Sequence, residues 1–432
     1  MTTNNAAERF ANEPFTCAVI GLGYVGLPLA ITITNAGLDV IGFDVSDRVV
    51  NQLSDGRSNT VDVTDAQLSE ALESRLRVTT DPTELAKADA VFICVPSPLG
   101  IHREPDLSYI RSAAETLGAY VRPGMFVSLE STTYPGTTTE VLVPALTASG
   151  LAIDTDLFVA FSPERVSPGG DLELNAIPKV VGGVSAASSE VGAAVYGRFI
   201  DTVHAVGSSE VAEFTKLLEN TYRAVNIALV NELAQFADRI GVDIWEAIDA
   251  AATKPFGFQA FYPGPGVGGH CIPLDPQYLA WRAREVGSSL SFIDTAERIN
   301  GGMPKYVAQR AIELLNEQAK SVRGSKILAV GIAYKPDVAD DRESASIEVL
   351  NELRSSGADV HVVDPNFDAA HIEARGFRPA TEPFTADFDL AIVLTHHSAV
   401  DYSAVAKAAP LVLDTRNAYA TLATRLDNVR VL

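Results

Sequence analysis

A glycine-rich loop at residues 263–276 carries the strongest chemical signal in the chain. It reads Pro-Gly-Pro-Gly-Val-Gly-Gly-His-Cys-Ile-Pro-Leu-Asp-Pro and presents Cys271 where backbone can press close against a ligand, with Asp275 four residues later. A lone cysteine is most often an inert buried thiol in an apolar strand or helix. Because this one is enclosed by glycine, histidine and proline, we interpret Cys271 as a nucleophile.

Two other groups of residues could assist a nucleophile. Lys216 and Asn220 are four residues apart in a segment expected to be helical, so they share a face where they could shuttle a proton and stabilise an oxyanion. A solvated lysine is the commoner explanation of Lys216. Glu164 and Arg165 follow a predicted strand, where Glu164 could act on a water molecule or a substrate hydroxyl; a surface ion pair is the alternative.

The elements that must position these groups begin with a dinucleotide-binding pattern. Residues 16–20 read as a buried strand, 27–36 as a helix and 39–44 as a second strand, with Gly-Leu-Gly-Tyr-Val-Gly at 21–26 between the first two. Its glycines permit a tight turn and close approach to a pyrophosphate. Asp44 ends the second strand, where a carboxylate binds ribose hydroxyls and repels a 2′-phosphate. We therefore expect NAD, and Arg48 is the residue that could instead favour NADP.

Further predicted strands bring polar residues to the ligand edge of an open α/β sheet. Ser97 follows the apolar run at 90–95 and Thr132 follows the run at 125–129, and another strand is expected at 157–161. Either residue could equally cap the next helix.

A second strand-turn-helix-strand unit is predicted after residue 324. Its strands are expected at 326–330, 360–363, 390–394 and 411–413, with a helix near 347–355. The basic residues Lys335, Arg342 and Arg416 lie at or beyond strand ends, which suits a diphosphate.

Residues 208–240 predict one long helix with an apolar stripe and no internal glycine or proline. A core helix and a dimerisation surface both explain the stripe, and the core helix is the simpler explanation. The helix could connect two domains, and the partner we expect there is a second copy of the chain.

Composition limits the remaining possibilities. A chain of 432 residues with 47% apolar side chains is longer than a single hydrophobic core usually accommodates, so more than one domain is expected. Its formal net charge of −22 disfavours a nucleic-acid partner. Three widely spaced cysteines suggest neither a disulfide framework nor a metal site, which fits a reducing cytoplasm. Residues 16–38 lack charge, but glycines and Pro28 interrupt them, so no membrane span is expected.

We therefore predict an α/β chain with two doubly wound Rossmann-like domains joined by a long central helix and a helical middle domain. Residues 1–14 are expected to be a disordered extension and 15–202 an NAD-binding Rossmann domain. Residues 203–320 would form the central helical domain with the cysteine loop, and 321–432 the C-terminal α/β domain. A ligand site is expected between the α/β domains.

The assembled motifs resemble those of the UDP-glucose/GDP-mannose dehydrogenase family from about residue 15 to the C-terminus. Gly-Leu-Gly-Tyr-Val-Gly-Leu-Pro, Ser-Pro-Glu-Arg, Lys-x-x-x-Asn, Gly-Gly-His-Cys-x-x-x-Asp and Tyr-Lys-Pro-Asp occur in the family's order. Residues 254–258, 261–266 and 278–284 are similar to the bacterial UDP-N-acetylglucosamine 6-dehydrogenase branch.

The resemblance implies NAD-dependent four-electron oxidation of the C6 hydroxyl of a UDP-N-acetylhexosamine to a uronic acid, through a cysteine thiohemiacetal and thioester, for surface polysaccharide precursors. UDP-N-acetylglucosamine is the favoured substrate; UDP-N-acetylmannosamine and UDP-glucose are the alternatives. Ser167-Pro168 stands where UDP-glucose dehydrogenases carry a second glutamate, which favours an N-acetylated sugar. More remote are a two-electron dehydrogenase and a catalytically silent nucleotide-sugar-binding protein.

The resemblance also implies a role for each site residue. The catalytic residues would be Cys271, Lys216, Asn220, Asp275, Glu164 and Thr132. NAD would contact Gly21, Gly23, Tyr24, Val25, Gly26, Asp44, Arg48, Ser97, Thr132 and Arg342. The UDP-sugar would contact Glu164, Arg165, Val166, Lys216, Asn220, Arg223, Tyr262, Gly266, Tyr334, Lys335 and Arg416.

Overall fold

The computed structural model describes residues 3–100, 103–166, 173–269, 271–382, 384, 387–422 and 426–432 of the chain. The chain forms two compact units. Unit 1 comprises Met1–Glu219 and Gln277–Ser288, and unit 2 comprises Asn220–Pro276 and Ser289–Leu432. Residues 203–320 contribute to both units, and the boundaries expected for three domains remain predictions.

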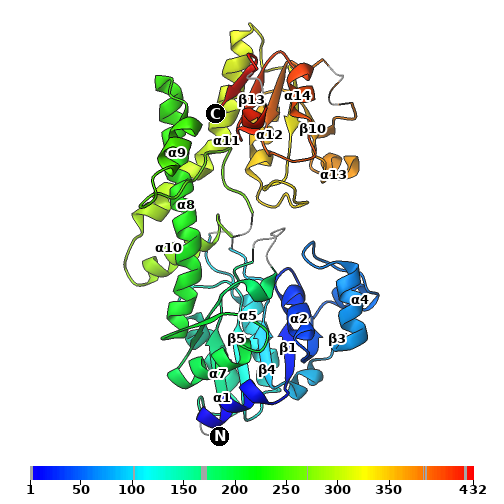
Figure 1. The fold of residues 1–432 in the computed structure, drawn as a ribbon, viewed down its shortest axis with the longest axis vertical. Helices are drawn as coiled ribbons and strands as arrows, with labels where there is room; N and C mark the ends of the chain where they lie inside the picture. The colour runs from blue at the N-terminus through cyan, green and yellow to red at the C-terminus, as the bar shows by residue number, and fades with distance from the viewer. Residues whose placement is uncertain are drawn as a thin grey trace. The chain divides into compact units, whose positions relative to one another are not determined.

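Unit 1 is built on a sheet of eight strands within its described residues (Figure 1). The strands are β1 (Thr16–Ile20), β2 (Asp39–Phe43), β3 (Leu76–Thr79), β4 (Ala90–Ile93), β5 (Met125–Leu129), β6 (Leu157–Phe161), β7 (Lys179–Gly183) and β8 (Val203–Val206). Their order is β3-β2-β1-β4-β5-β6-β7-β8, and β6 with β7 is the one antiparallel pair among them. The order reverses between β1 and β4, which creates the switch point where such sheets bind ligands.

Helices cover the first sheet because its central strands are apolar on both faces. They are α1 (Thr3–Asn12), α2 (Gly26–Asn35), α3 (Asp47–Ser54), α4 (Asp65–Ser74), η1 (Pro82–Lys87), α5 (Ser108–Gly118), η2 (Thr138–Leu142), α6 (Val143–Thr147), η3 (Leu174–Ala176) and α7 (Ala186–Tyr196). Side chains of α1, α2, α4 and α7 share one hydrophobic core with the strands.

The N-terminal segment differs from the predicted disordered extension, because residues 3–12 form α1. Phe10 is fully buried, and its ring centroid lies 5.0 Å from that of Phe15 and 6.5 Å from that of Phe126. Arg9 pairs with Asp89 at 2.6 Å. The prediction was wrong because one buried aromatic side chain is enough to hold a short polar helix on the core.

Helix α8 (Ser209–Ile240) confirms the predicted long helix. Its apolar stripe is exposed: Leu218, Leu229 and Phe236 are 53%, 51% and 58% accessible. Val225 is partly buried against other helices of unit 2, so the simpler core explanation holds there but is wrong for most of the stripe. No helix within the described ranges, α8 included, is long and apolar enough to cross a membrane.

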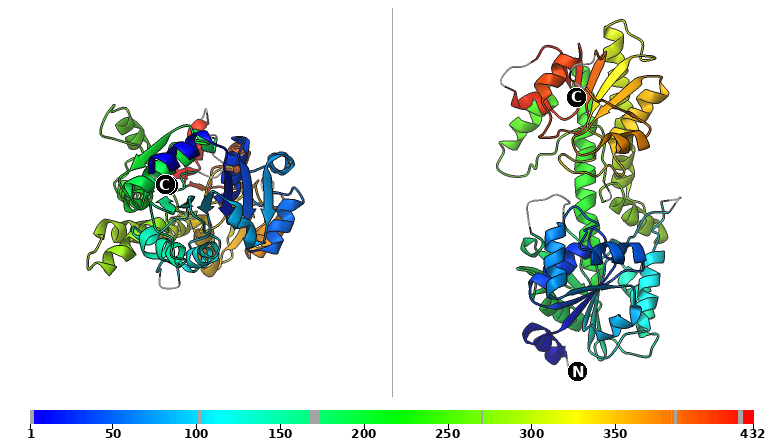
Figure 2. Two further views of the ribbon diagram at one scale, coloured as in Figure 1. Left: turned by 90° about the horizontal axis from the view of Figure 1, so that it is seen from below. Right: turned by 90° about the vertical axis from the view of Figure 1, so that its right-hand side faces the viewer.

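Unit 2 contains a second doubly wound sheet, whose described strands are all parallel. They are β9 (Lys326–Val330), β10 (Asp359–Val363), β11 (Arg378–Pro379), β12 (Leu390–Val393), β13 (Val412–Asp414) and β14 (Val429–Val431), in the order β11-β10-β9-β12-β13-β14. The strands of each sheet can be followed in Figure 2. Two doubly wound sheets in one chain confirm the predicted fold class.

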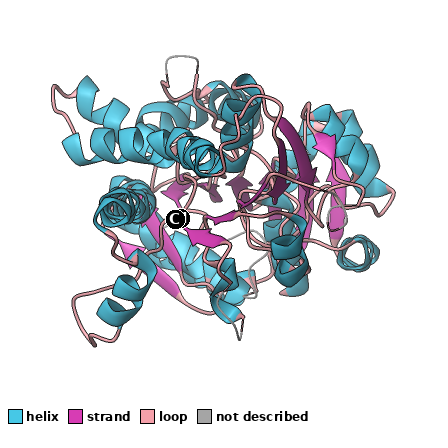
Figure 3. Ribbon diagram, turned by 90° about the horizontal axis from the view of Figure 1, so that it is seen from above, coloured by secondary structure: helices cyan, strands magenta, loops and turns pink. Residues whose placement is uncertain are grey.

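Helices again flank the strands in unit 2 (Figure 3). The helices of unit 2 are α9 (Ile244–Ala252), α11 (Ser291–Glu317), α12 (Ala345–Ser355), α13 (Ala369–Ala374), α14 (Tyr402–Ala408) and η4 (Ala418–Thr421), and those that pack on the strands are α11, α12, α13 and α14. Helix α10 (Asp275–Glu285) starts in unit 2 and continues into unit 1. Met303 and Val307 of α11 join the core on one face of the second sheet, and Val405 of α14 joins the core on the other.

Candidate functional site

The turn between β1 and α2 is shaped for close backbone approach. Gly21 has φ +90°, and a Cβ placed there would lie 2.8 Å from the carbonyl oxygen of Cys94. A Cβ at Gly26 would lie 1.8 Å from the carbonyl oxygen of Gly21, so only glycine fits. At Gly23 a Cβ would meet nothing within 4 Å, which leaves open space beside the start of α2. This is a cradle that can accept a pyrophosphate.

Asp44 lies beside this cradle at the end of β2. One of its oxygens accepts the Leu22 N–H at 2.9 Å and the other accepts the Ser46 N–H at 2.9 Å. These two bonds fix the carboxylate while leaving further acceptor positions for ribose hydroxyls. Arg48, on α3, is exposed.

The other predicted NAD residues of unit 1 lie in loops or at element ends. Tyr24 is 44% exposed, Val25 precedes α2, and Thr132 is partly buried after β5. Ser97 is buried after β4, and its carbonyl oxygen accepts the Tyr278 hydroxyl at 2.6 Å. The fold thus brings Gly21, Asp44 and the residues after β4 and β5 to one sheet edge.

Glu164 lies next to a buried network of charges that the sequence did not reveal. Lys179 Nζ is 2.5 Å from Glu130 Oε2 and 3.8 Å from Glu164 Oε2. The Tyr196 hydroxyl donates to Glu130 at 2.5 Å, and Lys216 Nζ donates to the backbone oxygen of Glu164. One ammonium thus faces two carboxylates in a dry environment.

Burial and charge act against each other in this network. Burial raises the pKa of Glu130 although Lys179 lowers it. Burial alone would lower the pKa of Lys179, but Glu130 and Glu164 raise it above its ordinary value. The lysine is therefore held charged, and it orients both carboxylates.

Arg165 and Val166 follow Glu164 directly. The Val166 N–H donates to Glu164 Oε1. The Arg165 guanidinium binds Glu219 and donates to the carbonyl oxygen of Pro178 at 2.8 Å. Ser167 and Pro168, on which the sugar preference rested, lie outside the described residues.

Glu213, one turn before Lys216 on α8, is a further buried acid absent from the predicted set. It accepts the N–H of Gly136 at 2.6 Å, and the N–H and hydroxyl of Thr138 at 2.8 and 2.7 Å. Burial raises its pKa to about 7, against these hydrogen bonds. Glu213 thereby ties α8 to the segment that follows Thr132.

The cysteine loop belongs to unit 2, where Cys271 is exposed. Its carbonyl oxygen accepts the N–H groups of Leu274 at 3.2 Å and Asp275 at 2.9 Å, which closes a turn at the start of α10. Asp275 is buried, and Asn220 Nδ2 donates to its Oδ2 at 2.5 Å. The structure thus brings three of the predicted catalytic residues of unit 2 together.

The other two cysteines differ from Cys271. Cys17 and Cys94 are buried in the first sheet, and burial raises the pKa of each thiol. Cys271 is therefore the exposed thiol of the three in the sequence. The described His, Cys, Asp and Glu side chains include no group of three that could hold a metal ion.

The glycines before Cys271 allow other chain segments to pack closely. A Cβ at Gly264 would lie 2.5 Å from the Arg416 guanidinium, and one at Gly266 would lie 2.8 Å from Ala345. Burial lowers the pKa of Arg416 to about 10, and its Nε donates to the carbonyl oxygen of Leu394. Arg416 therefore lies against the glycine-rich loop.

The remaining predicted residues of unit 2 vary in their surroundings. Tyr334 and Lys335 are half-buried, and Arg342 forms bidentate contacts with Asp340 at 2.6–3.1 Å. Arg223 is exposed, and Tyr262 donates to Asp249 at 2.7 Å on an exposed surface. These contacts give Arg342 and Tyr262 structural partners, and their ligand roles remain predictions.

Three family models match the chain in order. The NAD-binding domain of the UDP-glucose/GDP-mannose dehydrogenase family matches residues 15–200, its central domain matches 210–301 and its UDP-binding domain matches 328–421. Together these models cover well over half of the chain.

Individual relatives are similar over most of their length. Protein CapL of Staphylococcus aureus is 40% identical over 81% of this chain and 82% of its own. A UDP-N-acetyl-D-glucosamine 6-dehydrogenase of Pseudomonas aeruginosa is 36% identical over 88% of this chain and 90% of its own. The solved structure of a UDP-D-ManNAc dehydrogenase from Pyrococcus horikoshii superposes with a TM-score of 0.86 at 32% identity, covering 96% of this chain and 98% of that one.

Proposed function

The chain belongs to the UDP-glucose/GDP-mannose dehydrogenase family as an NAD-dependent enzyme, and from that premise we propose that it oxidises the C6 hydroxyl of a UDP-N-acetylhexosamine to the carboxylate. The reaction removes four electrons in two steps. The observation that carries the proposal is the exposed Cys271 thiol, fixed at a turn whose Asp275 is paired with Asn220.

NAD⁺ supplies the hydride acceptor in each oxidation. The chain's own contribution is the cradle of Gly21, Gly23 and Gly26 for the pyrophosphate and the fixed carboxylate of Asp44 for ribose hydroxyls. Tyr24, Val25, Arg48, Ser97, Thr132 and Arg342 complete the proposed contacts. Asp44 repels a 2′-phosphate, so NADP is a poor substitute.

Cys271 provides the chemistry that a second oxidation requires. The first hydride transfer converts the C6 alcohol to an aldehyde. The Cys271 thiolate then adds to this carbon, and loss of the second hydride from the resulting thiohemiacetal gives a thioester. Water attacks the thioester carbon, the carbon–sulfur bond breaks, and the carboxylate leaves with the thiolate restored.

The neighbouring polar groups take the remaining roles. Lys216 and Asn220 would stabilise the oxyanion and move protons, and Asp275, Glu164 and Thr132 would orient water. The pairing of Asn220 with Asp275, and of Lys216 with the Glu164 backbone, supports these assignments by fixing the side chains in place.

The UDP moiety is assigned mainly to unit 2, to which the UDP-binding family model matches. Lys335 and Arg416 supply positive charge for the diphosphate in a chain that is otherwise strongly acidic. The other proposed contacts are Arg165, Val166, Arg223, Tyr262, Gly266 and Tyr334.

The sugar is proposed to be N-acetylglucosamine, with N-acetylmannosamine as the second candidate and glucose as the third. Relatives named for each of the first two sugars are 36% and 35% identical to this chain.

The exposed stripe on α8, including Leu218, Leu229 and Phe236, supports a homodimer through this helix. We place the enzyme in the cytoplasm.

Counting NADH per sugar tests the proposal. With NAD⁺ and a panel of UDP-sugars, we expect two NADH for each UDP-N-acetylhexosamine consumed. A ratio of one with aldehyde or ketone accumulating would indicate a two-electron dehydrogenase. No NADH with any UDP-sugar would favour a binding protein.

Cys271→Ser is the matching variant. Serine cannot form the thioester, so kcat should fall by about 10³-fold or more while UDP binding by calorimetry is retained. Cys17→Ala, in the buried sheet, is the control and should lower the melting temperature without comparable loss of kcat. Near-normal turnover by folded Cys271→Ser would remove the thiol from the mechanism.

A further inference from the structure

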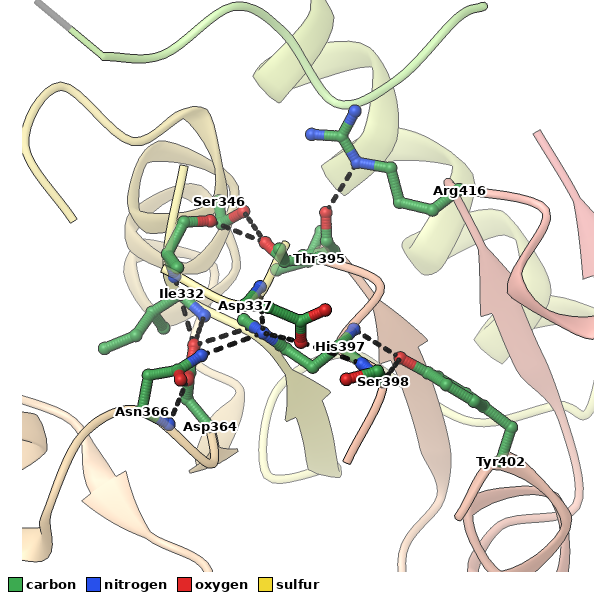
Figure 4. A network of polar contacts seen from close by, with 12 residues as sticks. Ile332, Asp337, Ser346, Asp364, Asn366, Thr395, His397, Ser398, Tyr402 and Arg416 are labelled. Carbon is green, nitrogen blue, oxygen red and sulfur yellow. Dashed lines mark hydrogen bonds and ion pairs between the residues drawn. The ribbon is translucent and has the colours of Figure 1, made fainter. Parts of the chain in front are cut away.

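A buried histidine of unit 2 lies outside every role assigned above. His397 is fully buried after β12 (Figure 4). Its Nδ1 lies 3.1 Å from the backbone nitrogen of Asp337 and 3.0 Å from Asn366 Nδ2, and its Nε2 lies 3.2 Å from Asp364 Oδ2. Both ring nitrogens are therefore engaged.

These partners define the ring's hydrogen-bonding direction. A backbone N–H can only donate, so Nδ1 accepts from Asp337 and the ring proton lies on Nε2, which donates to Asp364. Asp364 also accepts the N–H groups of Ile332 and Ala333 at 2.8 and 3.1 Å. Although burial raises it, the bond from His397 helps to hold the pKa of Asp364 below its ordinary value.

Asp337, whose backbone N–H binds His397, belongs to a strained loop. Its φ is +58°, and Glu343 near the other end of the loop has φ +49°, a conformation that costs a non-glycine residue about 1 kcal/mol. The Asp337 side chain accepts the Ser398 N–H at 2.9 Å. The loop is thus held in its conformation by contacts from residues 397 and 398.

The same loop supports the segment that carries Cys271. The Gly269 N–H donates to the carbonyl oxygen of Arg342 at 3.2 Å. A Cβ at Gly268 would lie 2.8 Å from both the Glu343 oxygen and Tyr334 Cβ, and one at Gly269 would lie 2.8 Å from the Tyr334 ring. The two glycines therefore lie directly on residues 334–343, two and three positions before Cys271.

We propose that His397 is a positioning residue: by holding Asp337 it fixes the loop of residues 334–343, and this loop in turn sets the position of the Cys271 thiol. The inference rests on the proposed function only in taking Cys271 as the reacting group. It assigns His397 no contact with substrate. The inference also implies that the loop that carries Lys335 and the loop that carries Cys271 move together.

Two amide variants separate the contacts of the ring. His397→Asn keeps an acceptor near the Nδ1 position, toward Asp337, whereas His397→Gln keeps a donor near the Nε2 position, toward Asp364. Both replace the same buried ring by an amide, so they control for each other. The proposal requires that His397→Gln changes the reactivity of Cys271 and that His397→Asn preserves it.

The readout is alkylation of Cys271 by iodoacetamide, followed by mass spectrometry. Cys17 and Cys94 are buried, so labelling of the folded protein reports the third cysteine. We expect His397→Gln to change the alkylation rate about 5-fold or more and to lower kcat about 10- to 100-fold, with KM for NAD⁺ unchanged. His397→Asn should remain within about threefold of wild type in both measurements.

Other outcomes overturn the proposal. If His397→Asn and His397→Gln have equal effects that follow their melting temperatures, His397 is merely structural. If the alkylation rate of His397→Gln equals that of the wild type, His397 does not influence the position of Cys271. If Gln does not fold, Asp337→Ala tests the second step of the proposal, because it removes the acceptor of the Ser398 N–H and keeps the backbone N–H that binds His397; an unchanged alkylation rate would overturn the link between the loop and Cys271. Two NADH per sugar in the wild type would leave the proposed function standing in every case.

Discussion

Glu213 offers a quantitative test of the buried charges in unit 1. It is fully buried on α8 and accepts three hydrogen bonds from Gly136 and Thr138. Its pKa is raised to about 7 by burial, against 4.5 for an ordinary glutamate. The native structure therefore binds a proton there that the unfolded chain has released.

The sign and size of the effect follow from proton linkage. Well below pH 4.5 both states are protonated and the group does not affect stability. Between pH 4.5 and 7 only the unfolded chain ionises, so the free energy of unfolding falls with rising pH, and it levels off above pH 7. The full loss is about 3 kcal/mol at neutral pH. Glu213→Gln cannot ionise and should not show this loss.

The assay is urea unfolding of wild type and Glu213→Gln from pH 4.5 to 8. The chain has two tryptophans, and Trp245→Phe leaves Trp281, which belongs to unit 1, as the fluorescent reporter. The difference in unfolding free energy should move in favour of Gln by about 3 kcal/mol as pH rises from 4.5 to 7.5. Glu210→Gln, on the same helix but partly exposed, is the control and should not reproduce this shift, because, although burial raises it, hydrogen bonds hold the pKa of Glu210 below its ordinary value. A difference that is constant with pH would refute the reasoning.

The remaining predictions concern other contacts. Lys179→Met leaves Glu130 buried without its cation and should cost about 3–5 kcal/mol in urea unfolding, more than Lys179→Arg; equal stability of the two would contradict this. Gly23→Ala should raise the Kd for NAD⁺ about tenfold with an unchanged melting temperature, because its Cβ would meet open space in the protein alone, whereas Gly26→Ala should also destabilise unit 1. Leu229→Glu should yield monomers in sedimentation velocity, and a persistent dimer would exclude the α8 stripe as the interface.

The central strands of both sheets could be predicted because burial on both faces makes them continuous apolar runs. β1, β5, β6 and β9 have the expected bounds. β3 and β8 were not predicted, since most of their residues are not buried and the apolar pattern that marks a strand is absent. The antiparallel placement of β7 depends on strand order, which periodicity does not encode.

Helix α8 shows where periodicity stops being informative. The spacing of Leu218, Leu229 and Leu233 identifies a helical face, but a core and an interface have the same 3.6-residue period. Only the tertiary structure shows that this face is exposed within the chain. The pattern predicted the element correctly and left its environment open.

The site shows a similar limit. Spacing placed Lys216 and Asn220 on one helix face, yet their partners, the backbone of Glu164 and the side chain of Asp275, lie more than fifty residues away in the sequence. The Glu130–Lys179 pair joins strands that are neighbours only through β6. Such buried pairs depend on strand order, and no local motif marks them.

The same kind of turn follows the first strand of each sheet, but its carboxylate has a different role in the two units. Gly21 and Gly331 both have φ near +90° after the first strand of their sheets, and Asp44 and Asp364 both accept backbone N–H groups of that turn. Asp44 accepts one N–H of the turn, from Leu22, and one from Ser46, and it keeps acceptor positions for a ribose. Asp364 accepts three backbone N–H groups and the His397 ring N–H, and three of these four bonds converge on its Oδ2. The second carboxylate is therefore committed to holding the protein together, which is why a repeated Rossmann-like turn need not bind a second dinucleotide.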